Sequence, residues 1–282
     1  MRVSRIRQVA PIAVGVFLAS VGALQAQDGE TRTNRTAIIR ELSKQLRWHD
    51  EDGARIYEAE KGKVTQSVLG ELDGFIAESF RPGVASAEQV KSALDKLLDL
   101  RDGPGNNAAF PTELPQGQFL IVGIELGRGG EGITEDAISF RAYKAIENRF
   151  AFVAHTEDLH SGHGDDPYLG GFRAVVLSAP PVAGEFWFIG IARVPPLTPP
   201  AIAMRLIAFN GERFRTTWAI NDITAEGVDE AVNFAADGFT VNKLFDPTGQ
   251  AALSPTVVIH EQYILALPGP KKVGEWQTER GW

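Results

Sequence analysis

From residue 118 onward the chain is a succession of short apolar runs with almost no helical pattern between them. The runs are rich in β-branched and aromatic residues and are bounded by turn residues, as in QFLIVGIEL, EFWFIGIARV, AIAMRLIAF and TVVIHEQYILAL. Parallel strands need long crossovers, which are usually helical, so strands without intervening helices indicate antiparallel pairing. We therefore predict a mainly antiparallel β domain over residues 118–282, built as a sandwich, a partial barrel or a propeller-like unit.

Two local signals refine this β domain. Asn210-Gly211 stands between two such runs and predicts a hairpin with a type I′ turn, which needs positive φ at both central residues. The segment 224–238, TAEGVDEAVNFAADG, reads as a single helix that ends at Gly238.

The segment that precedes the β domain has a helical pattern. Over residues 34–100, apolar residues recur every three or four positions, and Ser86 and Gln89 have the spacing of a capping box. Residues 101–117 are rich in Gly, Pro and Asn and predict a linker. The expected fold class is α+β, a short helical N-terminal segment followed by the β domain.

The N-terminus has the order of a secretory signal peptide. Residues 1–26 run from a basic start through a short apolar stretch to small residues. Cleavage after Ala26 would leave Gln27 first, with Ala23 as the alternative site. We therefore expect an extracytoplasmic protein, periplasmic or secreted, with no transmembrane span after cleavage.

Charge and cysteine content exclude several classes of function. The formal charge is −8, and loss of the three arginines of residues 1–26 takes it to −11, so broad binding to nucleic acid is not expected. The chain contains no cysteine, which excludes disulfides, thiolate nucleophiles and thiolate metal sites.

A glycine motif follows the first apolar run. Gly127, Gly129 and Gly132 have G-x-G-x-x-G spacing, which in dinucleotide-binding proteins must open a helix. The residues that follow alternate as in a strand, so we interpret the motif as a hairpin loop and expect no cofactor.

The chemically richest stretch is AHTEDLHSGHGDDP. Imidazole and carboxylate groups together suit a divalent transition metal such as zinc. We expect residues 157–170 to form an exposed polar loop, with a metal site as the alternative. The candidate ligands are His155, His160, His163, Asp165 and Asp166.

Near the C-terminus, His260 and Glu261 are adjacent in an expected strand and should point to opposite faces, which argues against an acid–base pair. Trp276 and Trp282 are expected to anchor the tail, or to offer an aromatic contact to a ligand.

No complete catalytic constellation is apparent in the sequence, so an enzyme is the less favoured interpretation. We expect an exported, non-enzymatic binding or scaffold protein whose partner is a protein or another envelope component. The alternative is a metal-binding protein or metal-dependent hydrolase that uses the loop of His155, His160 and His163.

Overall fold

The computed structural model describes residues 34–46, 58–98, 107–126, 134–163, 172–194, 201–225, 231–245 and 257–279, except positions 179, 236 and 268. The predicted signal peptide, the glycine motif and the second half of the His-rich stretch lie outside these residues. Within them, no helix is both long and apolar enough to span a membrane.

Helices form the first layer of the molecule. They comprise a helix over residues 34–46, α2 (Glu58–Ser79) and α3 (Ala87–Leu98). The expected capping box is present: the Ser86 amide donates to Gln89 Oε1 at 3.0 Å, and the Gln89 amide donates to Ser86 Oγ at 3.2 Å. These two bonds satisfy amides that would otherwise lack a partner at the start of α3.

Twelve strands form three four-stranded antiparallel sheets in the described part of the chain. The first sheet contains β1 (Ala108–Leu114), β2 (Gly117–Leu126), β3 (Thr134–Ile146) and β4 (Arg149–His163). The middle sheet contains β5 (Phe172–Val176), β6 (Phe186–Val194), β7 (Ala201–Phe209) and β8 (Phe214–Thr224). The last sheet contains β9 (Val232–Phe234), β10 (Gly238–Phe245), β11 (Val257–Ile264) and β12 (Lys271–Glu279).

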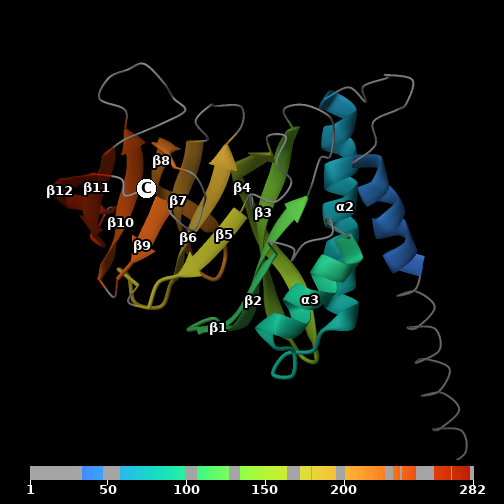
Figure 1. Ribbon diagram of the computed structural model, residues 1–282. Helices are drawn as coiled ribbons and strands as arrows, with labels where there is room; N and C mark the ends of the chain where they lie inside the picture. Colours follow the sequence, from blue (N-terminus) through green and yellow to red (C-terminus); the bar gives the residue numbers. More distant parts are fainter. Residues whose placement is uncertain are drawn as a thin grey trace, which may run out of the picture.

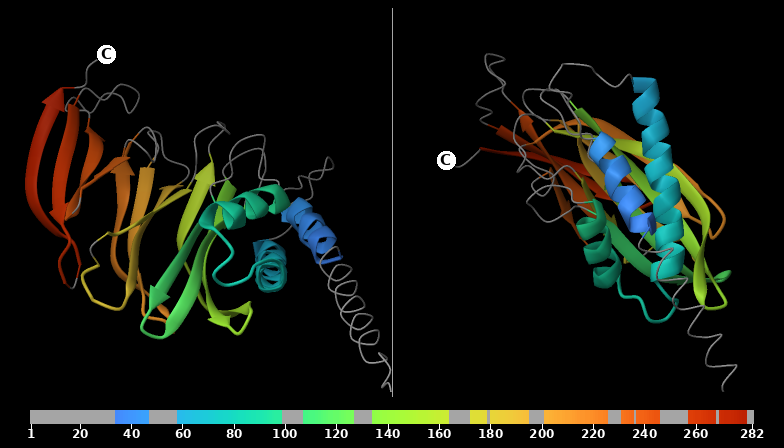
Figure 2. Two further views of the ribbon diagram at one scale, coloured as in Figure 1. Left: turned by 90° about the horizontal axis from the view of Figure 1, so that it is seen from below. Right: turned by 90° about the vertical axis from the view of Figure 1, so that its right-hand side faces the viewer.

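The helices and the three sheets follow one another in layers (Figure 1; Figure 2, left). One apolar cluster lies between the helices and the first sheet, a second between the first and middle sheets, and a third between the middle and last sheets. The predicted α+β class with a mainly antiparallel β domain is therefore confirmed, and the three described sheets are stacked.

Position in the stack explains the apolar pattern of each strand. The first and middle sheets are covered on both faces, so β2 and β7 are buried along almost their whole length. Among the described residues the last sheet packs against an apolar cluster on one face, and the exposure of β12 is correspondingly high.

Three local expectations are corrected. The predicted linker contains β1, and the predicted helix over 224–238 is helical at Ala231 but continues as β9 from Val232. The hairpin at Asn210-Gly211 is present, with four residues between the paired Phe209 and Phe214. Asn210 closes the turn: its amide donates to the Arg213 carbonyl at 3.4 Å, and its Oδ1 accepts the Glu212 and Arg213 amides at 3.0 Å. Gly211 alone has positive φ (93°), so this is not a two-residue type I′ turn.

A buried ion pair ties α2 to the first sheet. Arg141 of β3 donates to the Asp73 carboxylate from Nε at 2.7 Å and from Nη2 at 2.5 Å, and the Tyr143 hydroxyl donates to the same carboxylate at 2.8 Å. The Arg141 guanidinium also lies 4.6 Å from the centre of the Phe152 ring. This cluster fixes how the helical layer sits on the sheet.

Candidate functional site: a groove beside two edge strands

The His-rich stretch is largely strand rather than loop. β4 continues to His163, and its residues pair with β3 as far as Thr134. The expectation of an exposed loop over residues 157–170 is therefore wrong for its first half, because β3 is long enough to supply backbone partners that far. Residues 164–171, including Asp165 and Asp166, lie outside the described residues.

The strand separates the candidate metal ligands. At about 3.3 Å per residue, about 16 Å of strand lies between His155 and His160. His155 is half-exposed, with its Nδ1 3.4 Å from Glu157 Oε1. In the described part of the chain, no three His, Asp or Glu side chains are grouped to hold a metal. The side chains of His160 and His163 are not described, so the metal site stays a prediction that metal analysis of the purified protein would test.

The strands on either side of the glycine motif pair directly with each other. β2 and β3 are antiparallel, with Leu126 opposite Ala137, and the motif lies between them outside the described residues. A strand follows the motif where a dinucleotide site requires a helix.

His260 and Glu261 do point to opposite faces of the last sheet. On the outer face the His260 ring is stacked on Trp276 at 5.0 Å. On the inner face, Glu261 accepts hydrogen bonds from Lys272 at 2.7 Å and Tyr263 at 2.9 Å, and lies 2.6 Å from Lys243 Nζ. Burial alone would raise the pKa of Glu261, but these hydrogen bonds outweigh burial and lower the pKa to about 2.

A hollow lies where the first and middle sheets meet near α3. Two adjoining clefts, about 540 and 430 Å³, share Ala87, Ala109 and Phe110. β1 runs along both clefts, and β5 with the turn before β6 forms the opposite side. We call this continuous hollow the β1–β5 groove.

Aromatic packing holds the floor of the groove in place. The Phe110 ring lies 5.9 Å from that of Phe186 and 6.4 Å from that of Phe188, within the core between the two sheets. Gly184 belongs to the wall and has φ of 78°, and an added Cβ there would come within 3.1 Å of Pro115. Core contacts therefore hold the aromatic floor of the groove in place.

The rim of the groove carries acidic side chains. Glu88 and Glu113 are exposed and form no ion pair in the described structure. Lys91 pairs with Asp95 at 3.0 Å, so its charge is largely compensated within α3. Arg173 of β5 also lines the smaller cleft, so only the part of the rim near Glu88 and Glu113 favours a ligand with positive charge.

β5 adds unpaired backbone to the groove. It hydrogen-bonds to β6 on one side and to no described strand on the other. Val176, at its end, is 39% exposed and lines the larger cleft. An edge strand beside an apolar hollow can accept an extended peptide as an additional strand.

Sequence reasoning did not identify the groove, because its walls come from three separate parts of the chain. The one local signal is Phe110, a large apolar residue in the Gly- and Pro-rich stretch 101–117 that was interpreted as linker.

The described residues thus form a helix-covered stack of antiparallel sheets with a groove at one sheet edge. No family model matches the sequence, and neither a curated protein nor a solved structure matches the chain.

Proposed function

We propose that the chain is an exported, non-enzymatic binding protein whose β1–β5 groove receives an extended segment of a partner protein. Export rests on the sequence of residues 1–26, which lie outside the described structure. The observation that supports the binding role best is the coincidence of an apolar groove with the free edge of β5.

The dimensions of the groove suit such a ligand. Each of the two clefts falls within the range of about 300–1,000 Å³ that is usual for ligand sites. The floor at Phe110 would receive an apolar side chain of the bound segment. The backbone of that segment would pair with β5, and main-chain hydrogen bonds of this kind provide affinity with little dependence on sequence.

The preference for particular peptide sequences would then come from the acidic side chains of the rim and from the apolar floor at Phe110. The uncompensated Glu88 and Glu113 favour Lys or Arg in the bound segment. We therefore expect the groove to select extended peptides that combine a basic residue with a large apolar one.

The experiment is selection of peptides from a random library on the purified protein, followed by calorimetric measurement of their affinity. Val176→Lys places a long cation beside the groove, and we expect it to weaken binding of the selected peptides at least tenfold. Ile146→Lys is the matched control, because Ile146 is 47% exposed but lines neither cleft. Equal affinity for native protein and the Val176→Lys variant would contradict the proposal, as would an equal loss in both variants.

A further inference from the structure

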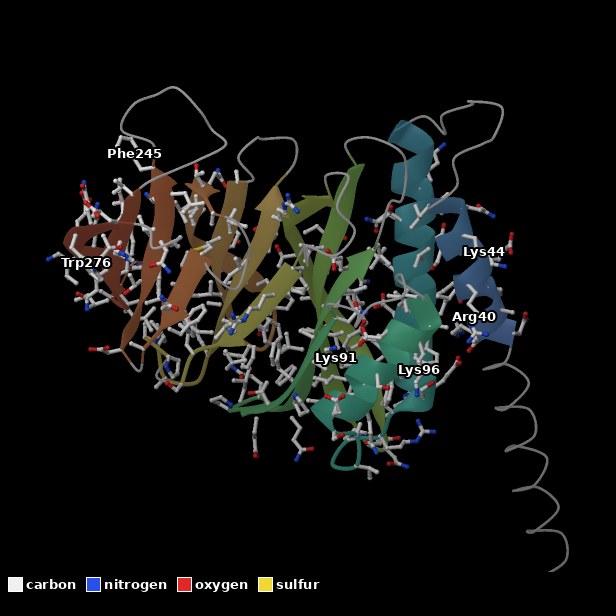
Figure 3. The ribbon with its side chains drawn as sticks, in the orientation of Figure 1. Arg40, Lys44, Lys91, Lys96, Phe245 and Trp276 are labelled. Carbon is white, nitrogen blue, oxygen red and sulfur yellow. The ribbon has the colours of Figure 1, made fainter. Side chains whose placement is uncertain are left out.

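We propose a second interaction surface, independent of the groove: the free edge of β12 pairs antiparallel with β12 of a second copy of this chain. A twofold axis at Trp276 would join the two last sheets into one continuous sheet. Figure 3 shows Trp276 on this sheet, at the end of the molecule opposite the helices.

The two edges of the last sheet differ greatly in length. β9 has three residues, whereas β12 has nine and hydrogen-bonds only to β11 among the described strands. Long edge strands with unpaired amides and carbonyls are templates for pairing with another chain. Short edge strands such as β9 do not offer this template.

The two faces of β12 restrict how it can meet a copy of itself. Gly274, Trp276 and Thr278 oppose Gln262, His260 and Val258 and lie on the outer face with His260. The alternate residues Glu275, Gln277 and Glu279 lie on the inner face. Opposed residues in an antiparallel pair share a face, so the twofold axis must pass through a residue of β12 and not between two residues.

Charge selects the register among the central positions. An axis at Glu275 would oppose Glu275 with its own copy, and an axis at Gln277 would oppose Glu275 with Glu279 of the second copy. Like charges directly opposite each other are destabilising. An axis at Trp276 opposes Glu275 with Gln277, and Gly274 with Thr278. It therefore avoids both like-charge contacts, of which the ion pair of Glu275 with Lys272 offsets only a part.

The Trp276 side chain is exposed and is already held in place by its own chain. It is 45% exposed, and its ring is parallel to that of His260 within 13°. Both His260 nitrogens are hydrogen-bonded, Nδ1 to Asn242 Oδ1 at 2.9 Å and Nε2 to Thr278 Oγ1 at 2.7 Å. Because these bonds already fix the ring pair, placing two Trp276 side chains at the axis would require little further ordering.

Two features of β12 oppose edge pairing in general, a register shift and lysine side chains. The register shift lies between Gln262 and Tyr263 and affects only the start of β12. Lys271 lies in the irregular start of β12, before the shift, and Lys272 is held by Glu261 and Glu275 of its own chain, so its charge is compensated. The regular half of the strand, residues 274–279, remains open.

The absence of cysteine permits a sharp test. Gly274→Cys and Thr278→Cys variants are oxidised separately and as a mixture prepared by joint unfolding and refolding. With the axis at Trp276, residue 274 faces residue 278 of the other copy at about 5 Å between Cα atoms, within disulfide reach. Identical residues are offset by four positions, about 13 Å, which is beyond that reach.

We expect covalent dimers only in the mixture, and native protein that elutes at twice the mass of one chain in light-scattering chromatography. Gly274 tolerates the change, because an added Cβ would approach nothing closer than Gln262 Oε1 at 3.4 Å. Thr278→Cys removes the hydroxyl that bonds to His260 Nε2, but His260 keeps its bond to Asn242 and its stacking on Trp276. Circular dichroism of each variant confirms that it folds. A native protein that is monomeric at 100 μM (about 3 mg/mL), or cross-linking of either variant alone to the same extent as the mixture, would overturn the proposal.

Discussion

Replacement of Asp73 by Ala should be among the most destabilising single changes in this protein. The carboxylate is the shared acceptor of Arg141 and Tyr143, and it joins α2 to the first sheet. Only 6% of the Arg141 side chain is exposed, so water cannot replace the lost partner. Burial lowers the pKa of Arg141, but the hydrogen bonds to Asp73 outweigh burial and raise it, which keeps the guanidinium charged.

The expected loss of stability comes from leaving the buried Arg141 guanidinium without its partner. Removing one member of such a pair costs about 3–5 kcal/mol, whereas replacing both members by apolar groups is often close to neutral. The Tyr143 hydroxyl would also lose its acceptor, a cost of about 1–3 kcal/mol. We therefore expect Asp73→Ala to cost at least about 4 kcal/mol, and the double variant Asp73→Ala with Arg141→Met to recover about 2 kcal/mol of that loss.

The assay is urea unfolding followed by far-ultraviolet circular dichroism, with all variants compared at pH 7. The single variants and the double variant form a cycle that isolates the coupling between the two side chains. A loss below 1 kcal/mol for Asp73→Ala would refute the reasoning. So would a double variant whose loss equals the sum of the two single losses, because the pair would then contribute no coupling.

Three further changes test other parts of the fold. The pKa of folded Glu261 is lowered to about 2 from an ordinary value of 4.5, so its contribution to the free energy of unfolding is present above about pH 4.5 and is lost as pH falls toward 2. Glu261→Gln should therefore cost about 2 kcal/mol at pH 7. In acid-unfolding titrations the difference from native protein should shrink below about pH 4.5. Gly238→Ala should lower the melting temperature clearly in calorimetry, because an added Cβ would collide with a backbone carbonyl of β11, whereas Gly274→Ala should leave it nearly unchanged. Ser86→Ala should cost about 1 kcal/mol in urea unfolding through loss of the cap of α3, and no change would show that the cap is dispensable.

The helices and strands that bury apolar faces were predicted well from the sequence. The helices present one apolar face to the first sheet, so their three- and four-residue spacing was visible. β2 and β7 are buried on both faces, and their continuous apolar runs identified them as strands.

The strands that sequence reasoning missed lack those patterns for physical reasons. β12 is exposed along most of its length, so its residues KKVGEWQTE show no apolar alternation. β9 is only three residues long, and β1 contains Pro111, which is tolerated on an edge strand. The β1–β5 groove could not be predicted, because its walls are brought together only by the stacking of two sheets.

The central claim is that an extended peptide binds beside β5, and hydrogen exchange measured by mass spectrometry tests it most directly. A peptide selected on the protein should slow amide exchange in peptides that cover β1 and β5, because new main-chain hydrogen bonds and burial protect those amides. Exchange in β10–β12 should be unchanged, since the last sheet lies away from the groove. Unchanged exchange in β5 at saturating peptide, or protection confined to the last sheet, would contradict the account.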